Sequence, residues 1–211
     1  MPVHTLETIG NSGICGVWEI TESAEILKQM ICLNPREEEV YASFRNELRR
    51  AHWLSYRLLI REMLGTREVE LEYTDAGKPL MHSPAGFVSV SHSGGFSAVL
   101  YSPCCRVGID VERVQERIEK VSHKFLSDEE LSAISGDHRL QDLVTRWAAK
   151  EALYKLYGSE VADFREHLHI FPFAPQGEGC LDAAVRLPGR EERFTLSYRR
   201  IDGYMLVWLL S

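Results

Sequence analysis

The sequence predicts an α+β fold of two pseudo-symmetric lobes, each with a small, mostly antiparallel sheet packed against a long helix. Helical and extended segments are mixed along the chain without regular alternation, which favours the α+β class. The 211 residues are 45% apolar, enough to build a core. Each half also contains a long helix and a hairpin, so we divide the chain into lobes of residues 1–103 and 104–211.

The first half is predicted to contain one long helix followed by short extended segments. Pro35 stands at a favourable helix start, leucines recur through residues 36–64, and Gly65 is a typical stop. Alternating residues and turn chemistry then predict strands and turns. These segments are residues 69–73, the turn 75–79, the hairpin strands 87–91 and 96–101, and the strand 107–112.

The second half is predicted to hold two helices and a closing hairpin. Ser127 and Glu130 have the spacing of a capping box, which opens a helix that reaches Ile134. A longer helix covers residues 140–157 and ends at Gly158. Residues 181–187 and 194–210 read as strands, the latter turning at Asp202-Gly203.

The two halves also match each other in sequence. Aligning Trp53 with Trp147 puts Leu59 on Leu153 and Arg61 on Lys155. In this register Arg57 stands where Glu151 stands, so only the second lobe offers a metal-binding carboxylate there. Coincidence is the competing explanation, because few positions match. If the lobes are real, a ligand cleft is expected between them.

Charge and composition restrict the classes of function. A net charge of −7 argues against nucleic-acid binding, which favours a basic face. The most apolar run, residues 204–210, is too short to span a membrane, and residues 1–10 do not resemble a secretory leader. The five cysteines are odd in number and lack C-x-x-C spacing, which favours a reduced, cytoplasmic compartment.

Three carboxylates are the first candidate site. Asp110 and Glu112 are two apart on a predicted strand, so their side chains project to one face. Glu151 lies about 40° from Trp147 around a predicted helix, beside the face that the tryptophan buries. Converging carboxylates repel one another unless a cation joins them, and all-oxygen ligands favour Mg²⁺. An acidic pair on a solvated strand is the simpler alternative.

Basic and hydroxyl groups near these acids suggest that an anion binds as well. Lys150 and Lys155 flank Glu151 and could reach a diphosphate held by Mg²⁺. Residues 89–95 form a turn rich in serine and glycine, with His92 near its tip, where phosphate could bind. A surface ion-pair ladder and an ordinary hairpin turn are the competing readings.

Together these residues resemble the 4′-phosphopantetheinyl transferases, in particular the larger two-lobed type that activates peptide and polyketide synthases. The motifs occur in the family's order between residues 77 and 158. They are Gly77-Lys78-Pro79, Ser91-His92-Ser93, Gly108-Ile109-Asp110-Val111-Glu112, residues 125–131, and Trp147-x-x-Lys150-Glu151-Ala152-x-x-Lys155.

The resemblance implies a monomeric, Mg²⁺-dependent enzyme with the 4′-phosphopantetheinyl transferase fold. It would move the phosphopantetheine arm of coenzyme A onto a serine of an apo acyl, peptidyl or polyketide carrier protein, releasing adenosine 3′,5′-bisphosphate. The first lobe would bind the adenine and phosphates, and the second would hold the metal and the catalytic helix. The residues implied are Asp110, Glu112 and Glu151 for Mg²⁺; Lys150 and Lys155 for the pyrophosphate and pantetheine; Ser91 and His92 for phosphate; and Lys78 and Pro79 for the adenine side.

Several roles are less well fixed by the sequence. Glu151 is the first candidate for the general base and Glu130 the second, although Glu130 could simply cap a helix. Arg50 and Arg57 are candidates for the 3′-phosphate of coenzyme A, with solvated helix charges as the alternative. Gly158-Ser159-Glu160 departs from the family's Gly-x-Gly pattern. For the carrier we expect a basic surface with an apolar centre, formed by Arg113, Arg117, Lys120, Val121, Phe125 and Leu126.

Two other functions use the same residues. One is a catalytically inactive module of the same fold that binds a carrier protein or a nucleotide. The other is a different Mg²⁺-dependent phosphotransferase that acts on a small nucleotide. Intact acids and lysines argue against the inactive module, because repelling charges need a reason to stay together.

Overall fold

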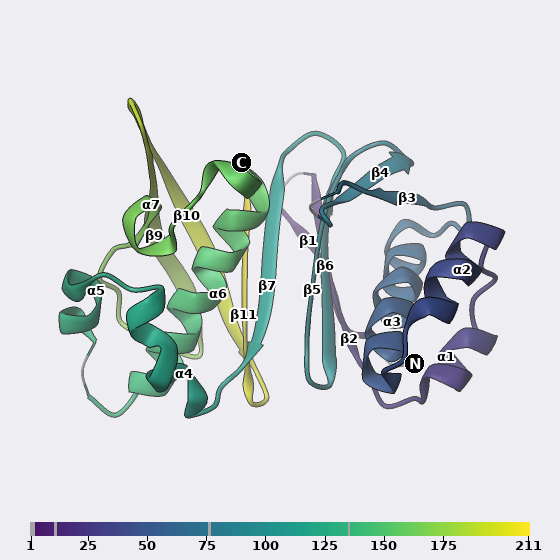
Figure 1. Ribbon diagram of the computed structural model, residues 1–211, viewed down its shortest axis with the longest axis horizontal. Helices are drawn as coiled ribbons and strands as arrows, with labels where there is room; N and C mark the ends of the chain where they lie inside the picture. The colour runs from purple at the N-terminus through teal and green to yellow at the C-terminus, as the bar shows by residue number, and fades with distance from the viewer. Residues whose placement is uncertain (1–2, 11, 76, 135) are drawn as a thin grey trace.

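The computed structural model describes residues 3–10, 12–75, 77–134 and 136–211 of the chain. Two antiparallel sheets stand side by side in the middle, and helices lie on the outer side of each (Figure 1). This arrangement confirms the predicted α+β class. Ala76, part of the predicted turn 75–79, lies outside the described residues.

The first sheet has the strand order β1-β2-β6-β5 and is antiparallel throughout. The predicted hairpin of the first half is its β5–β6 pair. A separate two-stranded sheet, β3-β4, carries the chain between helix α3 and β5. The strands are β1 (Val3–Ile9), β2 (Gly13–Glu19), β3 (Glu70–Tyr73), β4 (Pro79–Ser83), β5 (Phe87–Ser93) and β6 (Phe96–Ser102).

The second sheet has the order β7-β11-β10-β9-β8, again antiparallel. The turn between β10 and β11 falls at Asp202, which has a positive φ of 48°, as the predicted Asp202-Gly203 turn requires. The strands are β7 (Val107–Arg113), β8 (Leu168–Ile170), β9 (Glu178–Leu187), β10 (Arg190–Ile201) and β11 (Tyr204–Leu210).

The single helix predicted over residues 36–64 is in fact two helices. Helix α2 (Pro35–Ser43) ends at Phe44, whose backbone is extended. Helix α3 (Glu47–Leu64) begins at Asn46, whose side chain accepts a hydrogen bond from Arg49 N. Asparagine at this position starts a new helix, so the chain bends there. The predicted stop at Gly65 is confirmed, with φ of 60°.

The remaining helices lie in the first half before α2 and in the second half. The predicted capping box of Ser127 and Glu130 is present in both directions, and the long predicted helix matches α6. The helices are α1 (Ala24–Gln29), α4 (Arg117–Val121), α5 (Asp128–Ala133), α6 (Arg139–Tyr157) and α7 (Phe164–His167), with 3₁₀ turns η1 (Ser122–Lys124) and η2 (Gly158–Glu160). In the described part of the chain, none of them combines the length and apolar character needed to cross a bilayer.

Three apolar clusters hold these layers together. One packs α3 on the first sheet, with Trp53, Leu59 and Val99 among its members. A second packs α6 on the second sheet. The third lies between the sheets and joins β2 and β6 to β7 and β11. Residues 107, 109 and 111 of β7 belong to this third cluster, which leaves its even-numbered residues to face α6.

Candidate functional site

Strand β7 and helix α6 approach each other closely because of a glycine. A Cβ atom at Gly108 would collide with the Ala152 carbonyl oxygen and would stand 2.6 Å from Leu156 Cδ1. Without a side chain at this position, α6 can lie directly on β7. The even-numbered neighbours Asp110 and Glu112 project toward the same helix, which brings them to Glu151 and Lys155.

A cavity of about 350 Å³ opens where β5, β7, α3 and α6 meet. Its walls come from both sheets and from both long helices. They consist of Arg49, Tyr56, Tyr73, Gly77, Pro79, Val90, Ser91, His92, Asp110, Glu112, Trp147, Glu151 and Lys155. Of the residues named from the sequence, the three acids, Lys155, Ser91, His92 and Pro79 are therefore brought together.

Asp110 is buried and is held from two sides. Its Oδ1 accepts hydrogen bonds from Ser91 Oγ at 2.6 Å and from Lys155 Nζ at 2.8 Å. Lys155 also donates to the Ile109 carbonyl at 2.7 Å. Asp110 Oδ2 is buried without a hydrogen-bond partner among the described residues. That oxygen is a free acceptor beside the cavity, which a ligand could satisfy.

Glu112 is held by one residue from each half of the molecule. Trp147 Nε1 on α6 donates to Oε1 at 3.2 Å, and Ser93 Oγ on β5 donates to Oε2 at 2.9 Å. Burial, with a smaller contribution from the Asp110 charge, raises the pKa of Glu112 above its usual value.

Glu151 is the most strongly perturbed acid of the cavity. Burial raises its pKa to about 7, and repulsion from Asp110 and then from Glu112 adds to the shift, while Lys155 opposes it. A carboxyl group that titrates near neutrality can give or take a proton at physiological pH. The same repulsion also means that a cation placed among the three acids would be stabilised.

The oxygen donors of the three acids suit a divalent cation, but their side chains are not arranged around one common point. Within the residues that the structure covers, no three His, Cys, Asp or Glu side chains are arranged to hold a metal ion together. Lys155 provides a positive charge beside Asp110. The free Asp110 Oδ2 and the acidic, all-oxygen donors still suit Mg²⁺. The predicted ligands Asp110, Glu112 and Glu151 remain a prediction.

Another part of the cavity wall is formed by His92 and Arg49, and the ring of His52 stacks on that of His92. The rings of His52 and His92 lie 4.3 Å apart and nearly parallel. Arg49 Nη1 lies 2.6 Å from His92 Nε2, and because a guanidinium only donates, His92 is the acceptor. Burial, then His52 and Arg49, lower the pKa of His92 to about 4. The positive charge on this wall therefore comes from Arg49, a residue that the sequence did not single out as a ligand.

A second, smaller cavity of about 160 Å³ shares Gly77, Pro79, Val90 and Lys155 with the first. Lys78 lines it, and its Nζ lies 3.5 Å from the Leu156 carbonyl. Burial, with a smaller effect from Arg106, lowers the pKa of Lys78. The predicted adenine-side residues Lys78 and Pro79 thus lie beside the carboxylate cavity, where one elongated ligand could touch both.

Lys150 and Glu130 lie elsewhere, which argues against the roles that the sequence suggested for them. Lys150 is fully buried and donates to Glu130 Oε2 at 2.8 Å, to the Phe125 carbonyl at 2.7 Å and to the Phe164 carbonyl at 3.1 Å. The other Glu130 oxygen accepts from Ile170 N at 2.9 Å. This ion pair ties α5 and α6 to β8 in the interior, away from the two cavities.

Arg50 and Arg57 are also engaged by other residues of the first half. Arg50 Nε donates to the Phe44 carbonyl at 2.8 Å. Arg57 is buried over the Trp53 ring, 3.6 Å from its centroid, and donates to the hydroxyls of Tyr56 and Tyr73. Neither arginine lines the two cavities. Of the predicted docking residues, Phe125 and Leu126 belong to the core and are not part of the surface.

Comparisons with known proteins find similar sequences. Residues 106–197 match the model of the 4′-phosphopantetheinyl transferase superfamily. The chain is 25% identical to the L-aminoadipate-semialdehyde dehydrogenase-phosphopantetheinyl transferase of Rattus norvegicus, over 92% of this chain and 71% of that protein. It is 29% identical to the phosphopantetheinyl transferase of Thraustochytrium sp., over 81% and 67%. It is 31% identical to the 4′-phosphopantetheinyl transferase AcpT of Escherichia coli O157:H7, over 52% and 59%.

Proposed function

We propose that this chain is a member of the 4′-phosphopantetheinyl transferase superfamily, whose model matches residues 106–197, and that it transfers the 4′-phosphopantetheine of coenzyme A to a serine of an apo acyl, peptidyl or polyketide carrier protein. The observation that carries the proposal is the cavity in which Asp110, Glu112, Glu151 and Lys155 meet Arg49. The acidic side chains of this cavity could bind a divalent cation and the basic ones a phosphate, which suits a substrate that carries a diphosphate.

The reaction is a displacement at phosphorus. The serine hydroxyl oxygen attacks the β-phosphorus of coenzyme A, and the bond from that phosphorus to the bridging oxygen breaks, so that adenosine 3′,5′-bisphosphate leaves. Glu151, which lines the cavity together with Asp110 and Lys155, is our candidate for the base that takes the serine proton. Glu130, the second candidate for this role, forms a buried ion pair with Lys150, so we propose a structural role for it.

Charge compensation would come from two groups of the protein and from the cation. Lys155 lines both cavities and can turn from Asp110 toward a phosphate oxygen. Arg49 also lines the carboxylate cavity and offers its guanidinium there, with neutral His92 accepting one of its N–H groups. A bound Mg²⁺ would be held by Asp110, Glu112 and Glu151 and would neutralise part of the diphosphate charge.

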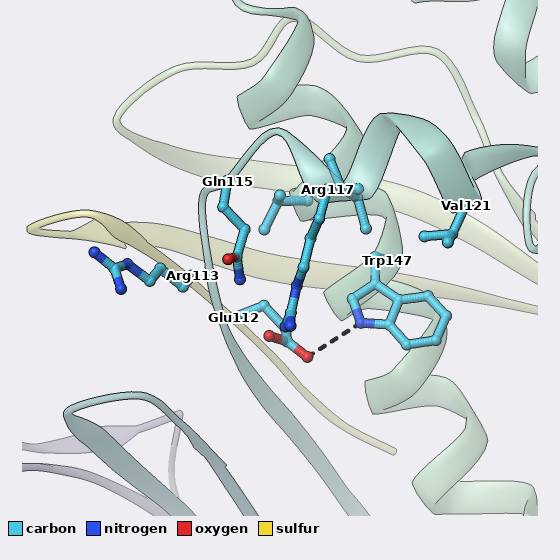
Figure 2. Close-up of a pocket in the computed structure, with 8 residues that line it drawn as sticks. Glu112, Arg113, Gln115, Arg117, Val121 and Trp147 are labelled. Atoms are coloured by element: carbon cyan, nitrogen blue, oxygen red, sulfur yellow. Dashed lines mark hydrogen bonds between the residues drawn. The ribbon is translucent and has the colours of Figure 1, made fainter.

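A third cavity, a groove of about 350 Å³, borders the carboxylate cavity and is our candidate for the carrier-binding surface. Glu112 and Trp147 line it together with Arg113, Gln115, Arg117, Ile118, Val121 and Val144. Figure 2 shows Arg117 reaching toward the Glu112 carboxylate, while Arg113 points away from it. Arginines around an apolar floor suit an acidic partner. We also propose that the protein acts as a monomer in the reducing cytoplasm, with its five cysteines as free thiols.

The test is an incubation with coenzyme A, Mg²⁺ and an apo carrier protein, followed by intact-mass analysis of the carrier. We expect a gain of one phosphopantetheine, which a chelator abolishes and which Glu151→Gln and Asp110→Asn nearly abolish. Glu160→Gln, which changes an exposed acid outside both cavities, should retain activity. No gain in the wild type with any carrier would favour the inactive module, and phosphate transfer without a protein acceptor would favour the nucleotide phosphotransferase.

Docking is tested separately by charge reversal. Arg113→Glu should raise the KM for the carrier and leave the KM for coenzyme A unchanged, because Arg113 lines the groove but points away from Glu112 (Figure 2). Arg193→Glu, on the exposed β9–β10 hairpin, is the matched control and should change neither. Equal effects of the two substitutions would move the docking surface elsewhere.

A further inference from the structure

The two sheets meet where strand β5 lies beside strand β7. These strands lie side by side in the centre of the molecule (Figure 1), yet no main-chain hydrogen bond joins them in the described residues. Serine hydroxyls of β5 take the place of the missing carbonyls. Ile109 N donates to Ser89 Oγ at 3.1 Å, and Val111 N donates to Ser91 Oγ at 3.2 Å. Both partners advance by two residues, so the strands run parallel.

The hydroxyl of Ser91 has a second use. It accepts from Val111 N and donates its own proton to Asp110 Oδ1 at 2.6 Å. A hydroxyl has one proton to donate, so its orientation is fixed by this pair of bonds. With Ser91 and Lys155 on Oδ1, the carboxylate of Asp110 is held so that the unpartnered Oδ2 remains available.

Ser93 continues the pattern toward the end of β5. Its Oγ donates to Glu112 Oε2 at 2.9 Å, while Trp147 holds the other oxygen. Ser89 differs from both, because its recorded contact is to the Ile109 backbone and not to a carboxylate. The three serines therefore share a strand face but only two of them touch the acids of the cavity.

We propose that Ser91 and Ser93 are positioning residues that orient Asp110 and Glu112 for a divalent cation, so that the first half of the chain sets the geometry of acids carried by the second half. The inference rests on the proposed function only in that the two acids bind a cation. Partners one step removed from a metal commonly contribute about 10- to 100-fold to its affinity.

The experiment measures Mn²⁺ binding to the free protein by electron paramagnetic resonance, with the free energy of unfolding measured in parallel. We expect Ser91→Ala and Ser93→Ala to weaken Mn²⁺ binding about tenfold or more. Ser93→Thr, which keeps the hydroxyl at a half-buried position, should bind Mn²⁺ with nearly the affinity of the wild type. Ser89→Ala is the matched control: it removes the same kind of bond to the β7 backbone and should leave Mn²⁺ affinity unchanged.

The Mn²⁺ affinities of these variants test the positioning role directly. Unchanged Mn²⁺ affinity in Ser91→Ala and Ser93→Ala, or an equal loss in Ser89→Ala, would overturn the positioning role and leave only a structural one. Absence of Mn²⁺ binding in the wild type would overturn it as well. If Mn²⁺ binding follows our expectation but no phosphopantetheine reaches any carrier, the proposed function fails and the positioning role stands.

Discussion

Replacing Lys150 tests whether its buried ion pair with Glu130 stabilises the fold or whether Lys150 binds the diphosphate of coenzyme A. Replacing Lys150 with methionine would keep most of the side-chain volume and remove the ammonium. The Glu130 carboxylate, with a side-chain exposure of 1%, would keep only the backbone N–H groups of Ser127 and Ile170. The carbonyls of Phe125 and Phe164 would each lose a donor.

Removing one partner of a buried ion pair typically costs about 3–5 kcal/mol, and the two N–H groups left on Glu130 favour the lower end. Burial lowers the pKa of Lys150 to about 8 against the attraction of Glu130, so the ammonium is still charged at pH 7. We therefore expect Lys150→Met to lower the free energy of unfolding by about 3 kcal/mol in urea denaturation at pH 7. The double variant Lys150→Met/Glu130→Gln, which leaves no buried charge, should recover part of that loss.

Activity separates this role from the one that the sequence suggested. Under conditions where Lys150→Met remains folded, its KM for coenzyme A should stay within about twofold of the wild type, because Lys150 lines neither cavity. Lys155→Met, which removes the lysine that lines both cavities, should lose roughly 100-fold in turnover. Wild-type stability in Lys150→Met combined with a raised KM for coenzyme A would refute our reasoning and restore Lys150 as a ligand of the diphosphate.

Three further predictions follow from the same contacts. Arg49→Met should weaken coenzyme A binding in calorimetry by about tenfold, whereas Arg50→Met should not, because only Arg49 faces the cavity. Burial lowers the pKa of His92 to about 4, so on acidification the unfolded chain binds this proton before the folded protein does. The free energy of unfolding should therefore fall as the pH is lowered from 6.5 to about 4. Urea denaturation across this range should show a shallower fall in His92→Gln. Gly108→Ala should lower the free energy of unfolding by about 1–3 kcal/mol by pushing α6 from β7, while Gly177→Ala, which has open space around it, should not.

The parts of the fold that could be predicted from the sequence are those with strong local signals. The capping box at Ser127, the glycine stop after α3 and the Asp202-Gly203 turn all appear where their chemistry requires. The break between α2 and α3 was missed although Asn46, a strong N-cap residue, marked it. Strands β1 and β2 are absent from the prediction, which assigns no element to the residues before Pro35.

The candidate site divides in the same way. The convergence of Asp110, Glu112 and Glu151 on one cavity follows from strand and helix periodicity, which the sequence displays directly. The same periodicity places Lys150 about 100° from Glu151 around the helix, and the packing of α5 then decides that Lys150 pairs with Glu130 in the interior. Arg49 could not have been chosen among the neighbouring arginines, because only the packing of α3 against β5 decides which one reaches His92.

Strand β7 explains why the carboxylates can be placed so firmly. Its odd-numbered residues, Val107, Ile109 and Val111, are buried between the sheets, whereas its even-numbered residues face α6. A slip of one residue would bury the acids between the sheets and turn the three apolar side chains toward α6. The free energy of the apolar core therefore fixes the register of Asp110 and Glu112. Mutual repulsion among acids cannot displace them unless that core is also disrupted.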